Sequence, residues 1–269
     1  MDDLERAALE QTRESGPGDA EFFVGYLPIP PRTRRFAIIA AVLLSALALG
    51  AGAGAVITTG AHARGVEPFV SGEPHVGLLT IAPEPVLWMD DATVTGGVRG
   101  VLLAGGGKHG IPSQLRALDG HIVRLNGLRL SRDGHWMLEV YQGEDAPGAL
   151  SPELEARLRE RPSESLGEVT LSGEIVDAKC HLGRMRPGTG RTHRACAQYC
   201  VAGGIPALLV TRAADGTETP YLLGGPDRES IRDRVLTYLA EPVRVTGRVT
   251  REGDLLILST DPATEVHRR

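Results

Sequence analysis

The chain has 269 residues, with 29 Lys and Arg against 34 Asp and Glu, so its net charge of −5 excludes a generally basic nucleic-acid-binding protein. Glycine (34 residues) and proline (18) are abundant, and aromatic residues make up only 4% of the chain. This composition favours short strands and tight turns over long helices.

An apolar segment near the N-terminus predicts a membrane anchor. Residues 1–35 are acidic and proline-containing, and we expect a polar tail that does not fold alone. Residues 36–57 carry no charge, and as a helix they extend about 33 Å, enough to cross the hydrocarbon layer of a membrane. A buried core helix is the alternative, but such helices rarely run this long without a polar face. We therefore predict a single transmembrane helix.

The residues around this segment predict its orientation. Three arginines lie between residues 32 and 35, which places the N-terminus in the cytoplasm and residues 58–269 in the periplasm of a bacterial inner membrane. Two alternatives are a signal peptide cleaved at 61–63 and a twin-arginine signal at 33–36. The length of the apolar run, and the 35 residues before it, favour an uncleaved signal anchor.

The rest of the chain contains an internal duplication. Residues 102–127 and 222–247 match at a constant offset of 120 with six identities, and SRDG (131–134) aligns with TREG (250–253) after a one-residue slip. Each copy predicts a strand, a glycine-rich turn, a helix, a strand, a turn and a strand. The predicted fold is therefore mainly β with short helices, in two related OB-like small β-barrel modules behind the transmembrane helix. A small β-sandwich is the alternative.

Local signals set the predicted boundaries. In the second copy Ile231, Val235 and Leu239 form one apolar helix face. Ser151-Pro152 begins a connecting helix that Pro162 ends. The expected organisation is a tail (1–35), a transmembrane helix (36–57), a linker (58–75), a first module (76–145), a helical linker (146–165) and a second module with a Cys/His insert (166–269).

The OB-like prediction raises the question of nucleic acid, which the chain is not equipped to bind. The C-terminal module has few aromatic side chains on which bases could stack and no basic cluster with them. The segment Gly105-Gly106-Gly107-Lys108 suggests a phosphate loop, but Leu102 stands where the first glycine of that motif belongs. We expect a flexible turn there. Lys108 and Lys179 are the only lysines in the chain.

All three cysteines, Cys180, Cys196 and Cys200, lie within 21 residues, with His181 and His193 among them. The first module has no counterpart, so the fold does not require this insert. A predicted helix over 192–201, ended by two glycines, places His193, Cys196 and Cys200 on one face. Cys180 follows a strand and is expected to meet that face.

Several chemistries fit these five residues. One is a structural disulfide between Cys180 and either Cys196 or Cys200, with one cysteine left over. A second is a metal or redox cofactor held by the three cysteines and one histidine, which suits zinc, copper(I) or iron–sulfur chemistry. A catalytic thiol with His193 as base and an unreactive reduced cluster are further alternatives.

Three stretches around the cysteines carry a family resemblance: GEIVDAKCHLG (173–183), RTHRACAQYC (191–200) and GGIP (203–206). They resemble an uncharacterised family of bacterial membrane-anchored proteins. The resemblance covers about 100 C-terminal residues. It implies a membrane protein of unassigned activity, with work beside redox enzymes as one expectation, and it supplies no catalytic residue.

Two functional classes follow from these observations. The first is a non-enzymatic, membrane-anchored accessory or binding protein of an envelope redox or respiratory complex. The second is an envelope thiol–disulfide or metal-handling enzyme, which requires a reactive Cys196 or Cys200. The absence of a Cys-x-x-Cys motif counts against a thioredoxin-like enzyme.

Overall fold

The computed structural model describes residues 29, 31–61 and 74–269, without the side chains of 58–61. The chain divides into two compact units, Met1–Ala63 and Arg64–Arg269. Most of the predicted tail (1–28 and 30) and of the predicted linker (62–73) lies outside the described residues.

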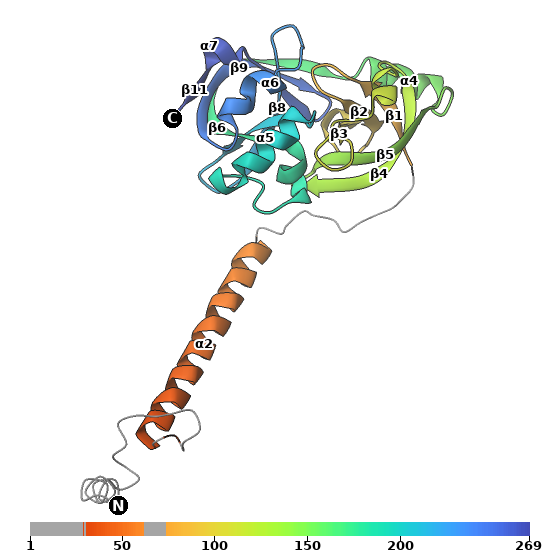
Figure 1. The fold of residues 1–269 in the computed structure, drawn as a ribbon. Coiled ribbons are helices and arrows are strands. Elements are labelled where there is room, and N and C mark those ends of the chain that lie inside the picture. The colour runs from red at the N-terminus through yellow and green to blue at the C-terminus, as the bar shows by residue number, and fades with distance from the viewer. Residues whose placement is uncertain (1–28, 30, 62–73) are drawn as a thin grey trace, which may run out of the picture. The chain divides into compact units, whose positions relative to one another are not determined.

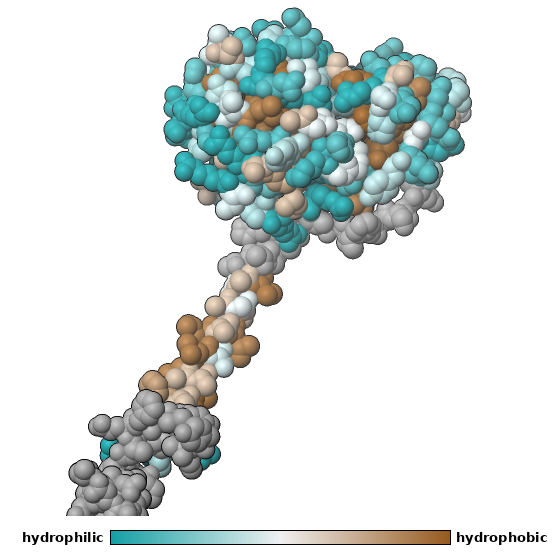
Figure 2. Space-filling view, in the orientation of Figure 1, coloured by the Kyte–Doolittle hydropathy of each residue, from teal (hydrophilic) through white to brown (hydrophobic). Residues whose placement is uncertain are grey.

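The first unit contains one long helix, α2 (Pro31–Ala61). Its segment Pro31–Ile57 contains an 18-residue stretch with a mean hydropathy of 2.3, and none of that stretch is buried. Apolar side chains such as Phe36 and Leu49 are 73% and 74% exposed, and they colour the helix brown in Figure 2. A core helix would bury such a surface, so the helix has the length and exposure of a possible membrane anchor. It begins at Pro31, before the predicted start at 36, because proline is well tolerated in the first turn.

The second unit consists of two closed five-stranded barrels (Figure 1), as the OB-like prediction expected. In the first barrel the strands close in the order β1-β2-β3-β5-β4, and β3 and β5 are parallel. Its elements are β1 (His75–Thr80), β2 (Val86–Asp90), β3 (Val98–Ala104), the short helix α3 (Ser113–Arg116), β4 (Ile122–Arg132) and β5 (His135–Asp145).

The helix α4 (Pro152–Arg159) connects the barrels, and the Ser151 side chain caps it by accepting a hydrogen bond from the Leu154 N–H. In the second barrel β10 pairs with both β8 and β9 and so closes the sheet. Its elements are β6 (Ser163–Asp177), β7 (Ala207–Arg212), β8 (Glu218–Gly224), α6 (Arg232–Val235), β9 (Pro242–Glu252), β10 (Leu255–Ser259), α7 (Pro262–Glu265) and β11 (Val266–Arg268).

The duplication extends to the register of the strands. Leu102 pairs with Met137 across the parallel strands of the first barrel, and Leu222 pairs with Ile257 in the second, which preserves the offset of 120. The predicted one-residue slip at the last hairpin is wrong. Glu252 pairs with Leu255 as part of β9, so the turn is Gly253-Asp254, and the offset continues through it.

The barrels share one hydrophobic core in addition to the interior of each. This shared cluster takes Trp88 and Met137 from the first barrel and Leu208 and Leu255 from the second. At Gly100 a Cβ would collide with the Leu255 side chain, so the backbone of β3 must approach β10 closely. Burial of apolar side chains from both barrels makes them one structural body.

Two sets of polar contacts between the barrels are reciprocal. The connection after β1 reaches the segment after β8, where Glu84 accepts a hydrogen bond from Ser230 and lies 3.1 Å from Arg232. The connection after β6 likewise reaches the segment after β3. At the hairpins, Arg132 pairs with Glu218 at the start of β8 at 2.7 Å, and Asp254 N–H donates to the Val98 carbonyl at the start of β3.

Candidate metal centre

The connection between β6 and β7 carries the cysteine cluster, and its first turn positions Cys180. A single π-helical turn, η2 (Cys180–Arg184), follows the end of β6. The Asp177 carboxylate accepts a hydrogen bond of 2.8 Å from the Cys180 N–H, which fixes the start of this turn. Gly183 ends it with a φ of 126°, a conformation that favours glycine.

A second helix supplies the other two cysteines. A 3₁₀ turn (η3, Arg191–His193) leads into α5 (Arg194–Ala202), which confirms the predicted helix and its glycine stop. Gly204 has a φ of 106°, as a left-handed residue at a helix end requires. Cys196 and Cys200 are four residues apart and therefore lie on the same face of α5.

The three cysteines converge as expected. Their Sγ atoms all lie within 4.8 Å of one another, and all three are free thiols in this structure. Cys180 and Cys200 are 3% and 2% exposed and belong to the core shared by the barrels, whereas Cys196 is half-buried. The Met185 Sδ atom lies 3.4 Å from Cys196 Sγ and adds a fourth sulfur. This set of donors suits a soft metal ion.

The two predicted histidines lie in different surroundings. His193 Nε2 and Asp177 Oδ2 form a buried 2.8 Å contact, and these two residues group with Cys180 as a second set of ligand atoms within 4.8 Å. His193 thus adjoins the cluster through Cys180. Among the described residues His181 joins neither group, and burial lowers its pKa to about 3, so its imidazole is neutral. Asp177 was not among the predicted ligands, although it lies three residues before Cys180.

A hydrogen bond between the two buried thiols, Cys180 and Cys200, shifts their pKa values in opposite directions. The Cys180 thiol donates to Cys200, and this bond together with burial raises the pKa of Cys180. The same bond, reinforced by attraction to Lys108, lowers the pKa of Cys200 to about 7. Cys180 therefore holds its proton while Cys200 carries thiolate character near neutral pH.

Lys108 reaches this cluster from the first barrel. Its Nζ donates to Cys196 Sγ at 2.7 Å and lies 3.8 Å from Cys200 Sγ. The hydrogen bond to Cys196 raises the pKa of Lys108. The expectation of a flexible turn at 105–108 is thus corrected, because this loop is docked against the insert. The one signal in the sequence was that Lys108 and Lys179 are the only lysines in the chain.

Lys179 secures the other side of the docked loop. It is 1% exposed, and its Nζ donates to the carbonyls of Gly105 and Gly107, each at 2.7 Å. The same Nζ lies 3.2 Å from Glu139 of β5, a carboxylate that is also buried. The loop is therefore fixed by a buried charge whose ion-pair partner is Glu139.

Glycines allow the loop and α5 to approach. The Gly110 N–H donates to the Gly203 carbonyl at 2.8 Å. A Cβ on Gly203 would overlap the Lys108 carbonyl oxygen, and one on Gly110 would meet the Gly204 carbonyl. Backbone rather than side chain thus forms this contact, which sets the position of Lys108 relative to the sulfur atoms.

Gly203→Ala is expected to lower the free energy of unfolding of the full chain by about 1–3 kcal/mol, the usual cost of overpacking. Its Cβ displaces the backbone of the docked loop. Urea denaturation in detergent, followed by circular dichroism, measures this change. Gly106→Ala is the matched control, because a Cβ there meets nothing within 4 Å and the stability should change by less than about 0.5 kcal/mol. Equal stability of the two variants contradicts the docked loop.

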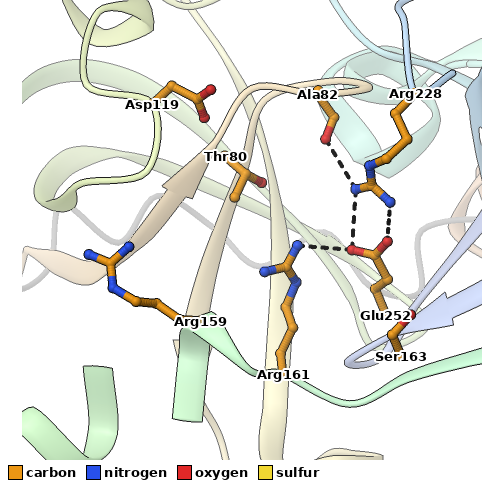
Figure 3. Close-up of a pocket in the computed structure, with 8 residues that line it drawn as sticks. All are labelled: Thr80, Ala82, Asp119, Arg159, Arg161, Ser163, Arg228 and Glu252. Atoms are coloured by element: carbon orange, nitrogen blue, oxygen red, sulfur yellow. Dashed lines mark hydrogen bonds and ion pairs between the residues drawn. The ribbon is translucent and has the colours of Figure 1, made fainter. Parts of the chain in front are cut away.

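A cavity of about 410 Å³ lies elsewhere, where the connecting segment passes between the barrels, and it holds Arg159, Arg161 and Arg228 (Figure 3). Arg161 and Arg228 both point to Glu252, which accepts hydrogen bonds from each. The opposite side carries Asp119, whose carboxylate accepts from the Ile81 N–H. Arg161 and Arg228 are thus neutralised by Glu252, and Arg159 pairs with Glu155 of α4 outside the cavity. Arg228 also donates to the Ala82 carbonyl of the first barrel, which joins the barrels.

Comparisons with known proteins provide no functional assignment for this site. No family model and no curated protein matches the chain. A solved structure titled "Crystal structure of the tetrameric p202 HIN2" aligns over 76% of this chain and 98% of that chain, with 9% identity and a TM-score of 0.22. A score this low supports no argument about fold or function.

Proposed function

We propose that this chain is a membrane-anchored, extracytoplasmic accessory protein that binds a soft metal ion at Cys180, Cys196 and Cys200. The convergence of their three Sγ atoms within 4.8 Å carries this proposal. Thiolates bind zinc, copper(I) and iron–sulfur clusters, and two of the three are shielded from water by the shared core.

The remaining parts of the proposal rest on the sequence. The three arginines in the first turns of α2 favour an orientation with the barrels on the periplasmic side of a bacterial inner membrane. The resemblance around residues 173–206 to an uncharacterised family of bacterial membrane-anchored proteins, together with the cysteine cluster, motivates an envelope redox complex as the proposed partner. The net charge of −5 supports the proposal that the protein does not bind nucleic acid.

Metal analysis of the purified full chain in detergent tests the proposal. The reduced protein is expected to bind one equivalent of Cu(I) or Zn(II), or to purify with a metal or cluster. Cys180→Ser, Cys196→Ser and Cys200→Ser should each abolish binding. The barrels should keep their circular dichroism spectrum, because the first barrel folds without cysteines.

The control is His121→Ala, which removes an exposed histidine paired with Asp145 on the first barrel and should leave binding unchanged. Failure of the reduced wild-type chain to hold any of these metals, with all three thiols titratable, contradicts metal binding.

One observation favours an envelope thiol–disulfide enzyme as the second candidate. The Cys180 thiol hydrogen-bonds to Cys200, whose pKa lies at about 7 beside Lys108. In that reaction Cys180 and Cys200 form a disulfide and give up two electrons and two protons, and a disulfide of a partner protein is reduced to two thiols. A thiol count of one after oxidation, with no metal bound before it, would favour this candidate over metal binding.

A further inference from the structure

We infer that Met185 is the fourth sulfur ligand of this centre and that its preferred ion is Cu(I), an inference that rests on the metal-binding function proposed above. The Met185 thioether lies 3.4 Å from Cys196 Sγ, at the residue that follows the π-helical turn. Cys180 at the start of that turn and Met185 just after its end thus both bring a sulfur atom to the cysteines of α5.

The chemistry of the fourth donor distinguishes the metals. Structural zinc sites take their fourth ligand from cysteine, histidine or a carboxylate, and a thioether is not among the usual donors. Soft Cu(I) accepts thiolate and thioether sulfur together. His193 is an alternative ligand, but it groups with Asp177 and Cys180 rather than with Cys196 and Cys200. The donor adjacent to Cys196 is therefore sulfur.

A cation beside the cluster offsets part of the negative charge that a bound Cu(I) ion would leave. Binding of the ion displaces the Cys180 proton to solvent, and three thiolates around Cu(I) then leave two negative charges, which a nearby cation must offset in a partly buried site. Lys108 supplies one such charge, at 2.7 Å from Cys196 Sγ. The cation comes from the first barrel, so the centre includes residues from both barrels.

One side of the site is exposed to solvent. Met185 is 46% exposed and Cys196 is half-buried, whereas Cys180 and Cys200 are almost completely buried. An ion that enters or leaves must therefore pass Met185 and Cys196. A Cu(I) ion held in this way is accessible to the sulfur ligands of a docking partner while its inner side stays dry.

The test compares Cu(I) and Zn(II) affinities of the full chain in detergent, each by competition with a chromogenic chelator under reducing conditions. Met185→Leu should weaken Cu(I) binding roughly 10–100-fold, the range typical when a residue that supports a metal site is lost. Its Zn(II) affinity should change less than about threefold. Met89→Leu, a substitution of a partly buried methionine of β2, is the matched control and should change neither affinity.

X-ray absorption at the copper edge provides a second readout, with a longer sulfur contact expected in the wild type and lost in Met185→Leu. An unchanged Cu(I) affinity in that variant, or Zn(II) affinity above that for Cu(I), overturns the inference and leaves the proposed function intact. Wild-type protein that holds neither ion overturns both. A Cu(I) site lost in Cys200→Ser and weakened in Met185→Leu supports both.

Discussion

Replacing Lys179 by methionine is expected to lower the free energy of unfolding by about 3–5 kcal/mol, the cost of removing one partner from a buried ion pair. Glu139 is 2% exposed, and among the described residues its remaining ion-pair partner would be Arg184, at 3.4 Å. Two carbonyls of the docked loop, at Gly105 and Gly107, lose their donor as well. Guanidinium denaturation of the full chain in detergent measures the loss.

Two further variants separate charge from packing. Lys179→Met combined with Glu139→Leu should recover much of the stability, since replacing both members of a buried pair by apolar groups is often neutral. Arg124→Met breaks an exposed pair with Glu144 and should cost less than about 1 kcal/mol. If Lys179→Met costs no more than Arg124→Met, the buried pair does not hold the loop.

Glu252→Gln is expected to destabilise the protein by about 3 kcal/mol, at the lower end for a buried pair because Arg228 is 46% exposed. Glu252 is 6% exposed on its side chain and is shared by Arg161 and Arg228 (Figure 3). Arg161 also stacks over Trp88 at 4.2 Å, so its guanidinium cannot leave without exposing that ring. Thermal unfolding at neutral pH measures the effect.

The same variant has a pH signature. Burial opposes the charge on Glu252, yet the bonds and attraction of Arg228 and Arg161 hold its pKa below the ordinary 4.5. The pairing therefore stabilises the fold above pH 4.5, and this stability is lost as the pH falls through the lowered pKa. The cost of Glu252→Gln should shrink under acid, whereas Glu164→Gln, at an exposed pair with Arg251, should stay within about 0.5 kcal/mol at every pH.

Periodic and repeated features of the sequence predicted the architecture. The uncharged run at 36–57 predicted the apolar helix, and the match of 102–127 with 222–247 predicted two related barrels. The hairpin slip was wrong because SRDG and TREG look alike locally, while strand pairing keeps Glu252 in β9. Pairing across the whole barrel outweighs the preference of a single turn.

The sequence predicted those parts of the site that depend on the geometry of a single helix or strand end. Helical spacing brought Cys196 and Cys200 together, and the end of β6 brought Cys180 to them. His181 is adjacent to Cys180 in the chain, yet among the described residues it joins neither group of ligand atoms. Lys108 and Met185 depend on how the loop and the turn pack against α5, contacts that no periodicity in the sequence encodes.

The reciprocal contacts between the barrels have a consequence for the ancestry of the chain. The connection after the first strand of each barrel contacts the segment before the short helix of the other, and each long hairpin meets the start of the other's third strand. Such an exchange of equivalent surfaces is the property of an isologous, two-fold dimer. A single barrel that once paired with its own copy would present this surface, and tandem fusion would have fixed the pair in one polypeptide. The cysteine segment between β6 and β7 is present in the second barrel alone, and it therefore makes the two otherwise equivalent halves different.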